Sequence, residues 1–146
     1  MKKTILFTLV ASALMTTVAQ AEALKTLNSD KVAQAQFKKI SNHKNLPAWT
    51  KTDGTTSATK TVKIAGKNYL VFGSCKPHDC SSEQIATIYA PQSKAMTSVY
   101  SRFNEKNSTQ QLKWMSNQPD ISIEEKTILL SALTGALDNY PQKFNF

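Results

Sequence analysis

The middle of the chain, residues 60–103, constrains the fold more than any other part of the sequence. Four of its segments have the length and the β-branched or aromatic content of strands: 60–64, 69–74, 84–90 and 96–103. The connections between these segments are short, whereas parallel neighbours would need crossovers of about a dozen residues or more. We therefore predict an antiparallel meander at the centre of a sheet of about five strands.

A helical pattern precedes the strands. We predict that Ser29 is the N-cap of a helix that ends near Ser41, with lysines on its outer side. One face of this helix carries apolar residues at helical spacing: Val32, Ala33, Phe37 and Ile40. The polar stretch 51–59 contains Asp53-Gly54 and is predicted to be a loop.

Helical patterns also follow the strands. Two pairs have the spacing of a capping box, in which a serine and a residue three positions later cap a helix start: Ser108 with Gln111, and Ser122 with Glu125. We predict one helix that contains Leu112 and Met115, and a longer one whose apolar stripe runs over 128–137. The order helix, strands, helices predicts an α+β domain with helices packed on the antiparallel sheet.

The first 21 residues are predicted to be a cleavable signal peptide. A positive start (Lys2-Lys3) precedes a short apolar run (5–15) and a small-x-small cleavage pattern (19–21). The apolar run is too short for a membrane span. We therefore expect an exported protein whose single folded domain is 22–146.

The net charge is positive but dispersed. The whole sequence has 18 basic and 10 acidic residues, a charge of +8, and loss of the two signal-peptide lysines leaves +6. No basic run is longer than Lys38-Lys39, and aromatic residues do not alternate with the basic ones as they would on a nucleic-acid platform. We therefore expect no nucleic-acid partner, no membrane span and a solvated, lysine-rich surface.

The two cysteines of the chain lie in one short loop between two predicted strands. In the oxidising compartment that export implies, Cys75 and Cys80 are expected to form a disulfide. So small a ring contributes only roughly 2 kcal/mol by chain entropy. Its greater effect is local, because the ring and the fixed φ of Pro77 leave the loop few conformations. Lys76, His78 and Asp79 do not all fit inside it, so at least one side chain is expected to face solvent.

Several other chemistries fit this loop less well. A thioredoxin-like motif has two residues between its cysteines, not four. A zinc site needs about four ligands, and only His43 remains outside the loop to complete one. A His78–Asp79 dyad lacks a nucleophile. We expect no metal, no cofactor and no catalytic residue. From these residues alone, two interpretations of the loop stay open: a plain structural staple and a recognition loop. Trp49 and Trp114 are predicted to anchor the core.

The loop sequence resembles a known family. Cys-Lys-Pro-His-Asp-Cys at 75–80 is similar to the hallmark loop of the Ivy family, the inhibitors of vertebrate lysozyme. The segments 46–49 and 132–137 and the closing Phe144-Asn145-Phe146 resemble the family as well. The resemblance covers the whole domain and implies a central antiparallel sheet with helices on both faces, a three-layer sandwich. It also implies a periplasmic protein that blocks c-type lysozyme.

In that family the disulfide-closed loop enters the active-site cleft of lysozyme. The resemblance implies that His78 reaches the two catalytic carboxyl groups, that Cys75 and Cys80 close the ring, that Pro77 stiffens it, and that Lys76 and Asp79 flank the contact. One alternative keeps the same loop but directs it at the cell's own murein-cleaving enzymes, the lytic transglycosylases. A second is an enzyme that uses His78 and Asp79 in a concave pocket. The oligomeric state is left open, with a homodimer as one option.

Overall fold

A computed structural model of the chain describes residues 25–146. The predicted signal peptide 1–21 therefore lies outside the described residues. No helix in the part of the chain that the structure describes is long and apolar enough to cross a membrane.

The centre of the fold is an antiparallel sheet, which confirms the α+β class and the predicted meander. Its strands are β1 (Thr55–Thr56), β2 (Lys60–Ile64), β3 (Lys67–Cys75), β4 (Glu83–Ala90), β5 (Ala95–Asn104) and β6 (Thr109–Ser116). The strand order is β1-β3-β4-β5-β6, and β2 also pairs with β3. Thr55 is opposite Cys75, while Ile64 is opposite Lys67, so β1 and β2 line opposite ends of β3.

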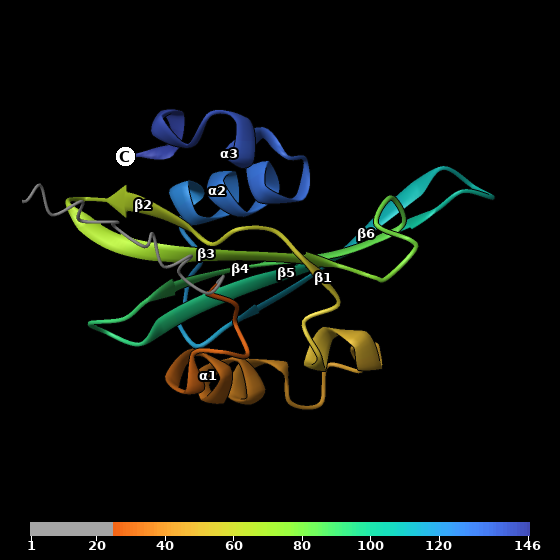
Figure 1. Ribbon diagram of the computed structural model, residues 1–146, viewed down its shortest axis with the longest axis horizontal. Coiled ribbons are helices and arrows are strands. Elements are labelled where there is room, and N and C mark those ends of the chain that lie inside the picture. Colours follow the sequence, from red (N-terminus) through yellow and green to blue (C-terminus); the bar gives the residue numbers. More distant parts are fainter. Residues whose placement is uncertain (1–24) are drawn as a thin grey trace, which may run out of the picture.

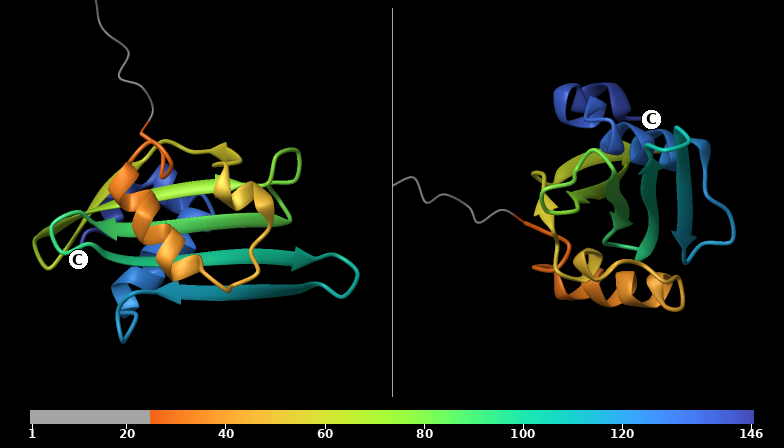
Figure 2. Two further views of the ribbon diagram at one scale, coloured as in Figure 1. Left: turned by 90° about the horizontal axis from the view of Figure 1, so that it is seen from below. Right: turned by 90° about the vertical axis from the view of Figure 1, so that its right-hand side faces the viewer.

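Helices flank the sheet on both sides (Figure 1). They are α1 (Lys31–Ser41), α2 (Ile123–Leu133) and α3 (Ala136–Asn139), with two 3-10 turns, η1 (Ala48–Lys51) and η2 (Pro141–Phe144). The end-on view of Figure 2 shows α1 on one face and the C-terminal helices on the other.

Alternation along the strands gives each face its own apolar cluster. Ile85 and Tyr89 of β4 belong to the cluster that contains Phe37 of α1. Ala86 and Ile88, from the same strand, belong to the cluster of α2. Both faces of the central strands are therefore buried, which explains the nearly continuous apolar run of β4.

The first helix begins one residue later than predicted. Its N-cap is Asp30 and not Ser29, because the Asp30 carboxylate accepts hydrogen bonds from the backbone N–H groups of Val32 and Ala33. Ser29 instead bonds to Thr26. The end at Ser41 is confirmed, and Ala33, Phe37 and Ile40 are buried, but Val32 is 51% exposed.

The helix predicted after Ser108 is wrong. Residues 109–116 form β6, which pairs with β5 along its whole length. The three-residue spacing of Leu112 and Met115 suggested one helical face, but in the strand the two side chains lie on opposite faces. Met115 packs in the cluster of α1, whereas Trp114 packs against that of α2.

The capping box at Ser122 and Glu125 is confirmed. The long helix, however, ends at Leu133, and Gly135 follows with φ of 77°, a left-handed conformation that glycine adopts without steric cost. The chain then turns into α3, which buries Leu137 in the same cluster as α2. At the C-terminus, Phe144 packs on this cluster, and the backbone of Phe146 bonds to the edge of β2.

Candidate functional site: the disulfide-closed loop

The loop of residues 75–82 extends the hairpin of β3 and β4 beyond the body of the sheet (Figure 1). Cys75 is opposite Gln84 in the ladder, and the N–H of Lys76 donates to the carbonyl of Glu83 at 3.0 Å. The disulfide between Cys75 and Cys80 is present, with the two Cα atoms 4.8 Å apart. The hairpin therefore carries a small closed ring at its end.

The tip of this ring is a tight turn. The N–H of Asp79 donates to the carbonyl of Lys76 at 3.0 Å, which leaves Pro77 and His78 as the two central turn residues. A type II turn favours proline at its second position and requires a positive φ at its third, and φ of His78 is 64°. Both central residues are exposed. A left-handed backbone at a side chain other than glycine is uncommon and is often found at functional positions.

The residues on either side of the tip bind back to the body. The Nζ of Lys76 donates to Asp79 at 2.9 Å and to Glu83 at 3.2 Å. The side-chain amide of Gln84 donates to the carbonyl of Cys80 at 2.7 Å. The sequence prediction that at least one side chain faces solvent is thereby confirmed, with His78 outward and Lys76 and Asp79 engaged with each other.

Glu83 is the centre of a polar cluster at the base of the loop. Its Oε2 accepts hydrogen bonds from the Tyr100 hydroxyl at 2.7 Å and from the Trp49 indole N–H at 3.2 Å, while Oε1 faces Lys76. The rings of Trp49 and Tyr100 lie 6.3 Å apart. The cluster thus connects the loop to η1 and to β5.

Electrostatics supports the ionised form of this carboxylate. Burial opposes the charge of Glu83, but the bonds from Tyr100, Trp49 and Lys76 outweigh it and lower the pKa of the carboxyl group. Burial, and then the bond to Glu83, raises the pKa of Tyr100. Asp79, followed by Glu83, raises the pKa of Lys76, and Lys76 in turn lowers the pKa of Asp79.

Sequence reasoning missed the polar cluster on which the loop rests. Trp49 was predicted only to anchor the core, and it is half-buried against the cluster of α1 while it also binds Glu83. Segment 51–59 was predicted to be a loop, yet β1 within it pairs with the last residues of β3. A side chain at Gly54 would collide with the carbonyl oxygen of Cys75. No local pattern could have revealed these contacts, because their partners are 18 or more positions apart.

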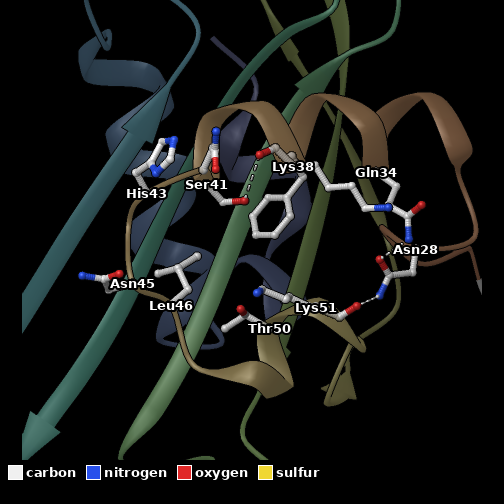
Figure 3. Close-up of a pocket in the computed structure, with 11 residues that line it drawn as sticks. Asn28, Gln34, Lys38, Ser41, His43, Asn45, Leu46, Thr50 and Lys51 are labelled. Atoms are coloured by element: carbon white, nitrogen blue, oxygen red, sulfur yellow. Dashed lines mark hydrogen bonds between the residues drawn. The ribbon is translucent and has the colours of Figure 1, made fainter.

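A separate hollow lies elsewhere. A pocket of about 610 Å3 lies between α1 and η1, and Figure 3 shows Lys38, His43 and Lys51 among its lining residues. No residue of the loop lines it, so it does not provide the concave surround that an enzyme with His78 and Asp79 would need. Within residues 25–146, no group of three or more His, Cys, Asp or Glu side chains is placed to hold a metal ion.

The fold and the loop together define a class of protein: a small α+β binding module that presents one braced, convex loop to a partner. Known proteins give this class a family. A sequence model of the family described as "Inhibitor of vertebrate lysozyme (Ivy)" matches residues 32–128. The chain belongs to this family, which is one of inhibitors and not of enzymes.

Individual relatives agree. The chain is 37% identical over 142 residues to the "Inhibitor of vertebrate lysozyme" of Escherichia coli strain K12, a match that covers 95% of this chain and 90% of that protein. The inhibitor of Escherichia coli O157:H7 gives the same figures. An uncharacterized protein of Yersinia pestis is 36% identical over 67 residues, 44% of each chain.

Proposed function

We propose that this protein inhibits c-type lysozyme by inserting the loop of residues 75–80 into the active-site cleft, with His78 at the front. The observation that carries the proposal is that the residues of the loop make different contacts. Pro77 and His78 form an exposed turn, whereas Lys76 donates hydrogen bonds to Asp79 and to Glu83 at the base of the loop. A convex tip on a fixed base is the shape that a cleft accepts.

The chemistry of the target supports His78 as the leading residue. Retaining glycosidases place two carboxyl groups about 5 Å apart on either side of the scissile bond. An imidazole between them donates a hydrogen bond to one or both, and it fills the space that a sugar ring needs. A loop that is already ordered loses little entropy on binding, so its contacts appear as affinity.

A rigid body behind the loop also limits the entropy that is lost when the loop binds. We infer a three-layer arrangement, with α1 on one face of the sheet and α2 and α3 on the other. Separate apolar clusters on the two faces support it, one with Phe37 and Tyr89 and the other with Ile88 and Ile128. Such a sandwich anchors β3 as far as Phe72 and β4 from Ile85 onward, a few residues from the loop.

We also propose that the protein acts in the periplasm. The signal-peptide pattern over 1–21 and the disulfide both suit an exported protein. N-terminal sequencing of the protein from a periplasmic extract should begin at Glu22. A chain that retains Met1 and stays in the cytoplasm would contradict this location.

The first test removes the imidazole. His78→Ala should weaken the binding of a c-type lysozyme by about 2–5 kcal/mol, as for an interface group that pairs with buried charge. The matched control is His43→Ala, because His43 is also exposed and also has a positive φ, 58°. Calorimetric titration measures both dissociation constants, and thermal melting verifies that each variant folds.

An unchanged dissociation constant for a folded His78→Ala variant would remove His78 from the mechanism. The same titration against a purified lytic transglycosylase separates the two targets. Tight binding of the transglycosylase with none of lysozyme would favour the alternative partner.

A further inference from the structure

A second element extends from the same end of the molecule as the loop. It is the outer part of the β5–β6 hairpin, residues 102–112, here called the arm. Arg102 is the last residue of β5 with a partner in β4, and beyond it a single bond, from the N–H of Phe103 to the carbonyl of Ser82, joins the arm to the loop. Every residue of the arm is exposed.

The arm is also longer than the loop. Figures 1 and 2 show that both extend past the same end of the sheet and that the arm reaches farther. The loop turns at His78, two residues after its last ladder bond at Lys76, whereas the arm continues from Arg102 into a turn at 105–108. The arm is therefore placed beside a partner that receives the tip of the loop in a cleft.

The arm carries apolar side chains that the described part of the chain leaves partly exposed. Phe103 and Leu112 lie on the same face of the hairpin, as diagonal neighbours, because Leu112 is opposite Ser101 and Phe103 is opposite Gln110. Their exposed fractions are 37% and 40%. This face continues from Trp114, which packs against the α2 cluster, but the helices end before the arm begins (Figure 1).

The turn of the arm is ordered by its own side chains. The Oδ1 of Asn104 accepts from the N–H of Lys106, and the Oδ1 of Asn107 accepts from both the N–H and the hydroxyl of Thr109. With Arg102 and Lys106 against Glu105, the arm has a small positive charge. Because many c-type lysozymes are basic, the attraction that it offers is apolar and uncharged-polar rather than ionic.

We infer that the arm is a second contact surface for lysozyme, beside the active-site cleft, with Phe103 and Leu112 packed against the outer wall of the enzyme. The inference rests on the proposed function, because it takes its partner from the loop. It assigns the loop to blocking the cleft and the arm to additional affinity and to selection among lysozymes whose clefts are alike.

The test is a double variant of the arm. Phe103→Ser with Leu112→Ser should weaken binding of a c-type lysozyme roughly tenfold or more, mainly through faster dissociation. The matched control is Ile123→Ser, since Ile123 is a 78% exposed apolar residue at the start of α2. Biolayer interferometry gives the rates, and light scattering gives the oligomeric state of each variant.

A second measurement uses the unmodified protein. Hydrogen exchange of backbone amides in the arm should slow when lysozyme binds, while that of the 91–94 turn, at the other end of β4 and β5, should not. Unchanged exchange in the arm, or wild-type affinity in a folded double variant, would overturn the inference while His78→Ala still tests the loop.

Two further outcomes also contradict the inference. If the double variant turns a dimer into a monomer and leaves lysozyme affinity intact, the apolar face belongs to a second copy of the chain. If the protein binds a purified lytic transglycosylase tightly and lysozyme not at all, the proposed function fails first, and the arm loses the partner assigned to it.

Discussion

Glu83 shows how one residue can support a recognition site without reaching the partner. Its carboxylate is mostly buried, with a side chain 12% exposed, and it accepts bonds from Tyr100, Trp49 and Lys76. A buried charge is costly unless it is hydrogen-bonded, and here three donors satisfy it. The surface pair of Lys76 with Asp79 contributes much less by itself because water screens it. Among the charged side chains near the loop, Glu83 therefore contributes most to holding the loop in place.

Lowering the pH should show how much the stability of the fold depends on the Glu83 carboxylate. Because the folded-state pKa of Glu83 lies below its ordinary value of 4.5, its stabilisation is complete above the unfolded pKa and is lost as the pH falls through the folded one. Asp30 and Asp79, whose pKa values are also lowered, act in the same direction. Glu83→Gln should lose less stability than wild type between about pH 5 and pH 3.

At neutral pH the same variant should be less stable by about 1–3 kcal/mol, because an amide replaces a charged acceptor in a buried site. Urea unfolding at several pH values measures both effects, and Glu105→Gln, in the exposed arm turn, is the control. A Glu83→Gln variant with the acid profile of wild type would mean that other carboxylates account for the loss.

At the scale of elements, the ring of Cys75 and Cys80 acts on the loop more than on the domain. It spans five positions of the sequence, and the hairpin beneath it is held by the β3–β4 ladder and by β1. The chain-entropy effect of so small a ring is only roughly 2 kcal/mol. What the ring restricts is the turn, where His78 has a left-handed backbone that an open loop need not keep.

Opening the ring should therefore reduce inhibition more than stability. The inhibitor is reduced, alkylated and freed of reductant before lysozyme is added, since lysozyme must not itself be reduced. We expect potency to fall by at least tenfold, because the loop then loses its preorganisation, with a modest fall in melting temperature. A Cys75→Ser, Cys80→Ser variant given the same treatment is the control. Equal potency before and after reduction would make the disulfide a staple only.

The elements also show where sequence patterns fail. The strands 60–64, 69–74 and 84–90 could be predicted because their type and short connections leave one pairing scheme. The segment 109–116 could not, because its outer half is exposed and lacks the alternation of a half-buried strand. Its identity as a strand comes from pairing with β5, a tertiary contact.

The exposed tip of the site could be predicted, but its base could not. Four residues, one of them a proline, in a closed ring must point some side chain outward, whatever the rest of the chain does. The base depends on Trp49 and Tyr100, which are 34 and 17 positions from Glu83. Only the packing of η1 and β5 against the loop brings these groups together.

At the scale of the whole molecule, charge opposes the proposed encounter. Residues 22–146 carry +6, and a basic lysozyme repels such a surface at long range. The acidic groups near the tip offset only a small part of this charge, because Asp79 and Glu83 share Lys76 and leave one net negative charge there. The two proteins therefore approach each other against electrostatic repulsion, and short-range contacts between complementary surfaces hold the complex together.

Salt should then speed association. Raising the ionic strength screens the repulsion, so we expect the association rate constant to increase between about 0.02 and 0.3 M salt. Stopped-flow measurement against a basic c-type lysozyme tests this, with a less basic lysozyme as the comparison. A rate that falls with salt would show that a local negative patch governs the encounter.

By itself, the sequence determined the α+β class, the central meander, the disulfide ring with its outward turn, and, through the residues 75–80, the family. All of these depend on local rules: strand type, loop length, ring size and a motif read in order. Tertiary structure alone decided that 109–116 is a strand, that Glu83 holds the loop, and that the arm stands beside it. These features depend on which segments pack together, and that choice is made by the core of the whole chain rather than by any stretch of it.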